Sequence, residues 1–544
     1  MVETLPFVDL VRTFVYDRFA LDPVAATIAG VPQYDHQLGD VTAAGWAKRR
    51  EFAEGWLARV EALQTADLGA AQLIDRELLL ADLRGERALA GFERWRRDPG
   101  IYSDLVTRGA YYALLRENAP IEERLAVLAE RLAQAPAALD AGRANLDPTL
   151  VPPEWVAIAA RTAPAGARFL RDQLPRSVPD TALGRAVGRT IVPVAEAAAL
   201  ALDRYAAWLR SDLEPAARGS FAIGRDAYEA LLKEKELLPY DSPTLGAFGE
   251  ELFAETEAKL VAAAKEMGDD DWRDSIARLR EDHPSEGDLV ATYRAEMQRS
   301  REAVRVAQLA TTPYGEDLVV EEMPDFQRTT YPYAAYIAAP PFAASRLGRF
   351  WVTLPDADDD DRTRRDRLEG HPRAGIAVIA CHEGYPGHHL QLTVAADHAS
   401  LARRSIRSNL VVEGWGLYVE ELMTELGYLD QPDTALLRLK DLLWRAARVV
   451  VDVGLATGEM SFDEAVAYMV DRAKLEPPNA IAEVRRYTLN PTQPSSYALG
   501  RQSILDLRAR ARAKGWGMRL FHDRILGAGS LPPALLARDT GLDS

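Results

Sequence analysis

Residues 194–209 of the chain read VAEAAALALDRYAAWL. Apolar side chains recur in this stretch at intervals of three and four residues, at Val194, Ala198, Leu202, Tyr205 and Leu209. Because an α-helix has about 3.6 residues per turn, this spacing gathers the apolar side chains on one side of a helix. The stretch therefore predicts an amphipathic helix that buries one face in a core.

The ends of this helix and the extent of the pattern can also be predicted. Pro193 stands just before the stretch and Glu214-Pro215 follow it, so the helix is expected to begin and end between them. The same spacing recurs in four further segments, 41–95, 120–145, 245–267 and 286–310. Such segments pack their apolar faces together in a helical core. We therefore expect a mainly α protein.

Residues 325–355 have a different character, because aromatic side chains stand among prolines and the helical spacing is lost. Within them, residues 350–354 read FWVTL, a short run of bulky and β-branched side chains. Such a run is typical of a β-strand. We therefore expect a small β-sheet just before the segment that carries the chemistry.

The length of 544 residues allows about three or four domains at roughly 150 residues each, or one large helical enzyme. The single cysteine excludes a disulfide scaffold and any metal site made of several cysteines. Lys plus Arg total 65 and Asp plus Glu total 82, so the net charge is −17. Such an acidic chain is not expected to bind nucleic acid, since the phosphate backbone requires clustered basic side chains.

The sequence shows neither a secretory leader nor a membrane-spanning stretch. The N-terminal residues, MVETLP, contain no basic group ahead of an apolar run. No stretch approaches the roughly 20 apolar residues of a membrane-spanning helix. We therefore expect a soluble cytoplasmic protein without a membrane partner.

Five of the eight histidines lie close together, at His371, His382, His388, His389 and His398. The centre of this cluster, residues 381–391, reads CHEGYPGHHLQ. A histidine followed by glutamate and then by further histidine is a metallopeptidase-like pattern. Neutral imidazoles bind zinc, and the adjacent carboxylate can accept a proton from the attacking water. The segment therefore predicts a metal site with Glu383 as the general base.

The spacing of these histidines departs from the usual four residues. His388 lies six residues after His382, so on a straight helix the two side chains would diverge by about 120°. His389 lies seven residues after His382, which restores the face but separates the two backbones by about 10 Å. A local bulge at Gly384–Gly387 could bring His388 back, because proline interrupts a helix and glycine permits unusual backbone angles. His388 is therefore favoured as the second ligand, with His389 as its rival.

A third ligand is expected downstream, where residues 409–422 read NLVVEGWGLYVEEL. Glu413 opens a helical pattern 25 residues after His388. Two histidines and a glutamate, with water in the fourth position, form a known catalytic zinc arrangement. Alternatively, Glu413 is an acidic residue at the start of a helix, where the macrodipole favours negative charge. The spacing leaves both interpretations open.

Two motifs together resemble those of a known family. They read H-E-x-x-P-G-H-H-L-Q at residues 382–391 and E-G-W-x-L-Y-x-E at residues 413–420. Both are similar to motifs of the bacterial domain-of-unknown-function family 885, which is regarded as related to the gluzincin metallopeptidases. Residues 22–35 and 497–508 are similar to its N-terminal and C-terminal segments, so the resemblance covers nearly the whole chain.

The resemblance implies an architecture. It implies a large, mainly α, two-lobed metallopeptidase-like fold with a deep cleft, a small β-sheet near the metal helix and a divalent metal at the floor of the cleft. The whole chain, 1–544, would then be one family-wide unit. It would consist of a mostly helical part at 1–320 and a metal-site part at 321–544 with the small sheet and the C-terminal helices.

The resemblance also implies the chemistry. Carried over to this chain, it makes His382, His388 and Glu413 the zinc ligands and Glu383 the general base. The expected activity is a zinc-dependent hydrolysis of amide bonds, above all of peptides. The expected cofactor is thus one zinc ion, and the expected partner is a small peptide or amide substrate.

Further side chains are candidates for contact with the substrate. Tyr497 could stabilise the oxyanion by donating a hydrogen bond, or it is a buried tyrosine with a satisfied hydroxyl. Arg501 could bind a substrate carboxylate, or it forms a surface salt bridge. Tyr336 and Arg346 are candidates for lining the cleft.

The chain departs from the family pattern in two places. In the C-terminal motif, Pro491-Thr492-Gln493-Pro494 stands where the family commonly has Pro-Gly-Gln-Ala. The family usually carries Asp-x-Gly-x-His downstream of the metal helix, whereas residues 452–456 read DVGLA, so Ala456 replaces the histidine. If that histidine supports the transition state, the alternative is a catalytically weakened metal-binding or scaffold protein. A hydrolase of a small non-peptide amide is a further alternative.

Overall fold

A computed structural model describes residues 6–324, 328, 331, 333–356 and 358–543. The chain divides into two compact units. Unit 1 comprises Met1–Leu68, Asp82–Ile223 and Pro340–Ala343, and unit 2 comprises Gly69–Ala81, Gly224–Ala339 and Ala344–Ser544. Both units are mainly helical, and a small sheet is present, so the prediction of a mainly α protein with a small sheet is confirmed.

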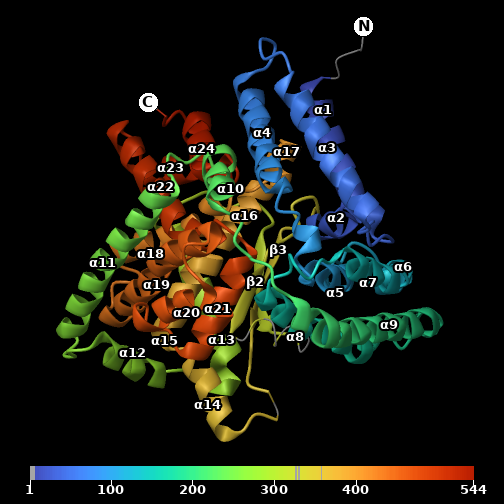
Figure 1. Ribbon diagram of the computed structural model, residues 1–544. Helices are drawn as coiled ribbons and strands as arrows, with labels where there is room; N and C mark the ends of the chain where they lie inside the picture. The colour runs from blue at the N-terminus through green and yellow to red at the C-terminus, as the bar shows by residue number, and fades with distance from the viewer. Residues whose placement is uncertain (1–5, 325–327, 329–330, 332, 357, 544) are drawn as a thin grey trace. The chain divides into compact units, whose positions relative to one another are not determined.

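Unit 1 consists of helices joined by turns (Figure 1). These helices are α1 (Phe7–Leu21), α2 (Pro23–Ala29), α3 (Ala43–Glu61), α5 (Gly100–Leu115), α6 (Ile121–Leu132), α7 (Ala135–Asn145), α8 (Pro153–Arg168) and α9 (Ala182–Trp208). A further helix, α4 (Ala70–Ala90), begins in unit 2 and ends in unit 1. Within unit 1, α8 packs along α9, and α5 packs against α6 and α8.

The first predicted helix lies in α9, but this helix begins earlier than predicted. It begins at Ala182, after the N-cap residue Thr181, so Pro193 lies inside the helix instead of before it. The missing N–H of Pro193 removes one backbone hydrogen bond. Ile191 and Ala195, on either side of the proline, are completely buried. Packing on both sides of Pro193 thus outweighs the lost bond.

Unit 2 contains the remaining helices and the sheet. Its helices are α10 (Arg225–Ala230), α11 (Ser242–Glu266), α12 (Trp272–Glu281), α13 (Leu289–Val306), α14 (Asp361–Glu369), α15 (Arg373–Ile379), α16 (His388–Ala396), α17 (Leu401–Ser405), α18 (Asn409–Glu425), α19 (Pro432–Thr457), α20 (Phe462–Asp471), α21 (Pro477–Leu489), α22 (Gln493–Ala513), α23 (Met518–Gly527) and α24 (Pro533–Thr540). Within this unit, the most extensive helix pairs are α18 packed against α22 and α11 packed against α19. Among the described helices, none is long and apolar enough to span a lipid bilayer.

The three strands form one sheet in the order β1–β3–β2. β1 (Asp317–Glu322) runs parallel to β3 (Leu347–Val352), and β2 (Ala334–Ile337) runs antiparallel to it. The predicted strand is therefore present, although it begins and ends earlier than residues 350–354. Because side chains alternate along a strand, Gly348 and Phe350 lie on the same face of β3.

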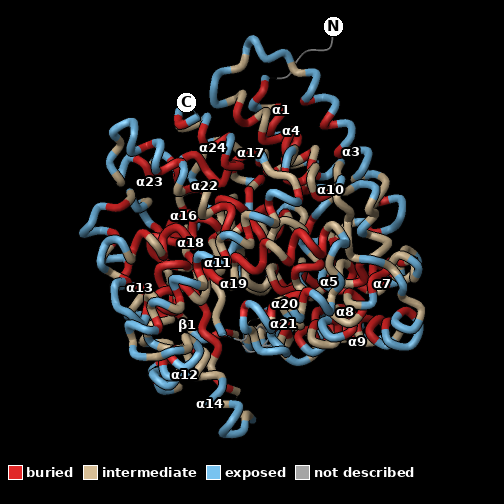
Figure 2. Tube along the Cα trace, turned by 60° about the vertical axis from the view of Figure 1, so that its left-hand side comes forward, coloured by how far each residue is buried: buried red, intermediate tan, exposed pale blue. Residues whose placement is uncertain are grey.

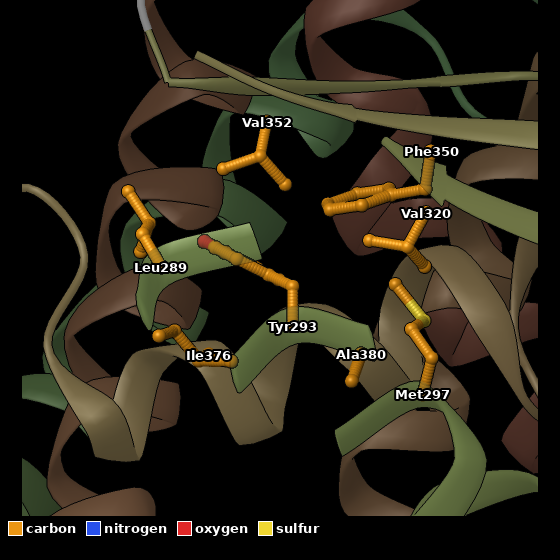
Figure 3. Packing of buried hydrophobic residues seen from close by; sticks show 8 residues of the cluster. All are labelled: Leu289, Tyr293, Met297, Val320, Phe350, Val352, Ile376 and Ala380. Carbon is orange, nitrogen blue, oxygen red and sulfur yellow. The ribbon is translucent and has the colours of Figure 1, made fainter. Parts of the chain in front are cut away.

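The face of β3 that carries Phe350 is packed into the core of unit 2. Figure 3 shows this cluster, in which side chains from α13, the sheet and the start of the histidine segment meet. Its buried members are Leu289, Tyr293, Met297, Val320, Phe350, Val352, Ile376 and Ala380. Burying each large apolar side chain contributes about 1.5–3 kcal/mol. Because Ala380 stands two residues before His382, this core holds the histidine motif in place.

Burial differs strongly between two short helices of unit 2 (Figure 2). α14 has no buried residue, in keeping with its charged sequence. In α16, in contrast, every residue except Val394 is buried. The two histidines that open α16 are therefore enclosed by protein.

His522 on α23 is completely buried in unit 2 and is held as a neutral ring. Its Nδ1 lies 2.8 Å from the carbonyl oxygen of Leu309, and its Nε2 lies 2.8 Å from the hydroxyl oxygen of Tyr418. A carbonyl oxygen can only accept a hydrogen bond, so Nδ1 carries the proton and Tyr418 donates to Nε2. Burial lowers the pKa of His522 from 6.5 to about 4.

Acid should therefore destabilise the fold between pH 6.5 and 4. In this range the unfolded chain takes up a proton at His522 that the folded chain excludes, so stability falls as the pH falls, by at most about 1.4 kcal/mol per pH unit. His522→Asn should flatten this dependence, since asparagine does not titrate. The measurement is the urea midpoint of unfolding across this range, with His36→Asn, at an exposed site, as the control. An unchanged slope in His522→Asn would contradict the prediction.

Candidate metal centre

Helix α15 does not continue as a regular helix through the histidine motif. It passes into a π-helical turn at Ala380–Gly384, the backbone becomes extended at Tyr385, and α16 begins at His388. This interruption lies where the sequence predicted a bulge. It allows side chains from two separate segments to face each other. The ring centres of His382 and His388 are 4.8 Å apart, with their planes at 88°.

Glu413 on α18 completes a cluster with these two histidines. One ligand atom from each of His382, His388 and Glu413 lies within 4.8 Å of the others. Nε2 of His388 is 3.6 Å from Oε2 of Glu413. Both histidines are buried, and the Glu413 side chain is 19% exposed, which leaves one open side. Two imidazoles and a carboxylate in this arrangement could hold a divalent cation such as zinc.

The charges at this cluster favour a cation. Burial by itself lowers the pKa of His388, but the nearby carboxylates of Glu413 and Glu383 outweigh it and raise the pKa to about 9. Burial by itself raises the pKa of Glu413, but the nearby imidazole of His388 turns the net shift downward. The surrounding carboxylates thus stabilise a positive charge at this point, which is the condition for binding a metal ion.

Close contact between two helices places Glu413 in the cluster. The backbones of α18 and α22 touch at Gly414 and Gly500, where a Cβ atom on either residue would collide with the other helix. Gly416, two residues further along α18, faces His382, and a Cβ there would lie 2.5 Å from Cε1 of the ring. Glycine is required at these positions because the approach leaves no room for a side chain.

Glu420 orients the first histidine. Its Oε1 lies 2.7 Å from Nδ1 of His382, and the carboxylate is buried. A carboxylate accepts this hydrogen bond, so Nδ1 carries the proton and Nε2 is left for a metal. No role was predicted for Glu420 from the sequence. A signal was present, because Glu420 lies seven residues after Glu413, which places both on one face of the helix.

His389, the rival ligand, is engaged elsewhere. Its Nε2 lies 2.7 Å from Oε2 of Glu316, and its Nδ1 lies 3.1 Å from the hydroxyl of Tyr336. The hydroxyl of Tyr385 donates to the same oxygen of Glu316 at 2.5 Å, and Arg301 pairs with the other oxygen. Both ring nitrogens of His389 therefore belong to a buried network, which includes the predicted cleft residue Tyr336.

Glu383 and Tyr497 lie at the cluster. Glu383 is partly exposed, and its negative charge helps to raise the pKa of His388. Burial is the larger cause of the raised pKa of Tyr336, and the charge of Glu383 adds to it. Tyr497 on α22 lies near Glu413 and interacts with its carboxylate. Burial and then the charge of Glu413 raise the pKa of Tyr497. The structure thus brings both predicted residues to the two histidines and Glu413.

The two predicted arginines form salt bridges within the chain. Nε of Arg501 lies 2.8 Å from the carboxylate of Glu421. Nε of Arg346 lies 2.7 Å from the carboxylate of Asp397, just after α16. Each guanidinium is therefore held by a carboxylate of the chain itself, as in the salt-bridge alternative considered for Arg501.

A separate cavity of about 590 Å³ lies in unit 1, between α3 and α4. Its walls are mostly apolar and include Trp46 and Trp95, whose ring centres are 6.5 Å apart. None of the residues that line it belongs to the metal cluster.

Glu420→Gln should weaken metal binding while the fold is retained. An amide holds Nδ1 of His382 less firmly than a carboxylate does, and loss of such a partner typically reduces metal affinity about 10- to 100-fold. The measurement is competition for zinc with a chromophoric chelator. Glu425→Gln, on the same helix, removes a salt bridge with Arg508 instead and is the control. Equal zinc affinity in all three proteins would show that Glu420 does not orient the ligand.

Replacing the two adjacent histidines one at a time should give different results. His388→Ala removes a member of the cluster, so stoichiometric zinc binding should be lost. His389→Ala should keep the zinc but lower the stability by about 1–3 kcal/mol, because Glu316 loses a buried partner. Elemental analysis and thermal melting measure the two effects. Loss of zinc in His389→Ala, with zinc retained in His388→Ala, would reverse the assignment.

The chain shares its fold with two solved bacterial proteins. One, from Shewanella oneidensis, is described as a "putative lipoprotein of unknown function"; it is 23% identical with a TM-score of 0.80, over 98% of this chain and 99% of that chain. The other, the "putative lipoprotein from Colwellia psychrerythraea", is 19% identical with a TM-score of 0.82, over 99% of this chain and 98% of that chain. No curated protein matches the chain significantly.

The cytoplasmic location predicted from the sequence is contradicted by these two proteins. Each is described as a "putative lipoprotein", and lipoproteins are anchored to a membrane by a lipid. The prediction rested on the lack of a leader and of a membrane-spanning stretch. That reasoning was insufficient, because a lipid anchor requires no spanning helix.

The family is identified from the sequence of the chain. A model of the family described as "Bacterial protein of unknown function (DUF885)" matches residues 23–539. This range includes the histidine motif, the Glu413 motif and all but the two ends of the chain. The chain belongs to this family of bacterial proteins of unknown function.

Proposed function

We propose that this protein is a metal-dependent hydrolase of amide bonds and that its substrates are peptides. The observation that carries the proposal is the convergence of His382, His388 and Glu413, whose ligand atoms lie within 4.8 Å of one another. We further propose a two-lobed, gluzincin-like organisation in which the substrate binds in a cleft above this cluster.

The donor set fits zinc. Two histidines and one glutamate occupy three positions of a tetrahedral site and leave the fourth open. Glu420 holds the proton of His382 on Nδ1, so Nε2 keeps its lone pair for a metal. Zinc bound there would supply a Lewis acid, which polarises the amide carbonyl and lowers the pKa of water.

Glu383 is proposed as the general base. It directly follows His382, and its charge reaches His388. Within the described residues, no hydrogen bond or ion pair holds its carboxylate. A carboxylate in this position can accept a proton from the attacking water and return it to the leaving amine.

Tyr497 is proposed to stabilise the oxyanion. Its interaction with Glu413 indicates that the phenol lies at the cluster, and its raised pKa keeps the hydroxyl protonated and able to donate. Ala456 offers no such donor, because its side chain is a buried methyl group. Tyr497 is therefore the side chain to which the proposal assigns this role.

Glu383→Gln separates catalysis from metal binding. The variant should keep the wild-type zinc stoichiometry, because the ligands are unchanged. Hydrolysis should fall at least about 100-fold, because an amide cannot accept the proton. The measurements are elemental analysis and mass spectrometry of a peptide library after incubation. Glu281→Gln, at an exposed position of α12, should change neither quantity.

Two results would count against the proposal in different ways. A wild-type protein that binds zinc but cleaves nothing in the library would favour a metal-binding scaffold, the alternative raised by Ala456. A protein without stoichiometric metal, whose thermal midpoint does not rise on addition of zinc, would contradict the metal site itself.

A further inference from the structure

Arg407 is a cation without a counter-ion. In the part of the chain that the structure describes, no hydrogen bond or ion pair holds its guanidinium, although its side chain is partly buried. Arg403, four residues earlier, is in contrast held by Asp75 and Asp539. Burial lowers the pKa of Arg407, which reflects the cost of withdrawing an unpaired charge from water. Charged side chains in such places are normally paired, so the missing partner points to a ligand.

The segment that carries Arg407 is anchored. The N–H of Ser408 donates to the carbonyl oxygen of Ser530 at 2.8 Å, and its hydroxyl donates to the buried Glu236 at 2.6 Å. Arg407 stands directly before this residue and six residues before Glu413, at the entrance to α18. The guanidinium is therefore presented from a fixed backbone that also carries a proposed metal ligand.

Arg407 lies near Tyr336, which contacts the histidine segment. Among the described titratable groups, Tyr336 is the one that interacts with Arg407. The hydroxyl of Tyr336 lies 3.1 Å from Nδ1 of His389, and the charge of Glu383 acts on the same tyrosine. Tyr336 thus adjoins Arg407 on one side and the metal segment on the other. Among the described residues, no carboxylate is a cause of the pKa shift of Arg407.

We infer that Arg407 binds a carboxylate of the substrate, so that the site selects peptides carrying a free carboxylate near the scissile bond. This inference rests on the proposed function. A planar guanidinium binds a carboxylate through two parallel hydrogen bonds, and its own lack of a counter-ion leaves both donors available. The carboxylate can be the C-terminus of a peptide or an Asp or Glu side chain, since the chemistry of recognition is the same.

A cation beside the site would help to hold an anionic substrate. The carboxylates of Glu383, Glu413 and Glu420 lie at the metal cluster or next to it, whereas Glu316 is already paired with Arg301 and His389. A positive group offsets the repulsion between such carboxylates and an anionic substrate. Arg501, the arginine predicted for this role from the sequence, is neutralised by Glu421. Arg407, in contrast, has no such partner among the described residues.

The test measures binding without turnover. In zinc-loaded Glu383→Gln protein, calorimetry compares the dissociation constants of three peptides: a free acid, the same peptide as its C-terminal amide, and the amide with a terminal glutamate. We expect the free acid to bind at least about 10-fold more tightly than the plain amide. Comparison of the free acid with the glutamate peptide distinguishes recognition of a C-terminal carboxylate from recognition of a side-chain carboxylate.

Variants then attribute the preference to Arg407. Arg407→Met in the same background should abolish the preference for the acid, and Arg407→Lys should restore part of it, since the charge returns without the bidentate geometry. Arg365→Met, at an exposed position of α14, is the matched control and should retain the preference. If thermal melting shows that Arg407→Met does not fold, Arg407→Gln and Arg407→Lys provide the same comparison.

The outcomes separate this inference from the proposed function. Peptide cleavage without any preference for a carboxylate, in binding or in KM, would overturn the inference and leave the hydrolase in place. A preference that depends on Arg407, in a protein that cleaves nothing, would support carboxylate binding and overturn the hydrolase. Binding of none of the three peptides, or a preference unchanged in Arg407→Met, would overturn the inference.

Discussion

The contact between α18 and α22 is the constraint on which the rest of the site depends. Gly414 and Gly500 allow the two helix backbones to touch, and this contact sets Glu413 beside Tyr497. Gly416, on the same helix, leaves the space that the ring of His382 occupies. A side chain at any of these glycines would push its neighbour away and separate the carboxylate from the imidazoles. The cluster is thus held by packed helices, which position functional groups more accurately than loops do.

The break between α15 and α16 gives two adjacent histidines different environments. His388 faces His382 and Glu413, where the carboxylates raise its pKa. His389 enters a buried network with Glu316, and Gly348 on β3 provides the room for its ring. Neighbouring residues on a helix point about 100° apart, so a single helix turn can serve a site and its supporting network at once. The net charge of −17 has little bearing on this arrangement, because the local pairing of charges determines what each group can bind.

The fold class could be predicted from the sequence, while element boundaries could not be predicted as well. Apolar spacing located the helices because helical periodicity is local, and the aromatic run at residues 350–354 located β3 to within a few residues. The helix α9 shows the limit of this reasoning. A proline ends a helix on local grounds, but burial of Ile191 and Ala195 carries α9 through Pro193. Contacts with the rest of the fold are not encoded in the local pattern.

At the candidate site, the sequence by itself determined which chemical groups were available, namely histidines and carboxylates without a second cysteine. The spacing of the histidines also predicted an interrupted helix. Only the tertiary structure decided how these groups are used. It sets His388 rather than His389 beside Glu413, makes Glu420 the partner of His382, and pairs Arg501 while leaving Arg407 unpaired. The reason is physical, because each of these outcomes depends on contacts between residues far apart in the chain, and spacing along one segment does not determine them.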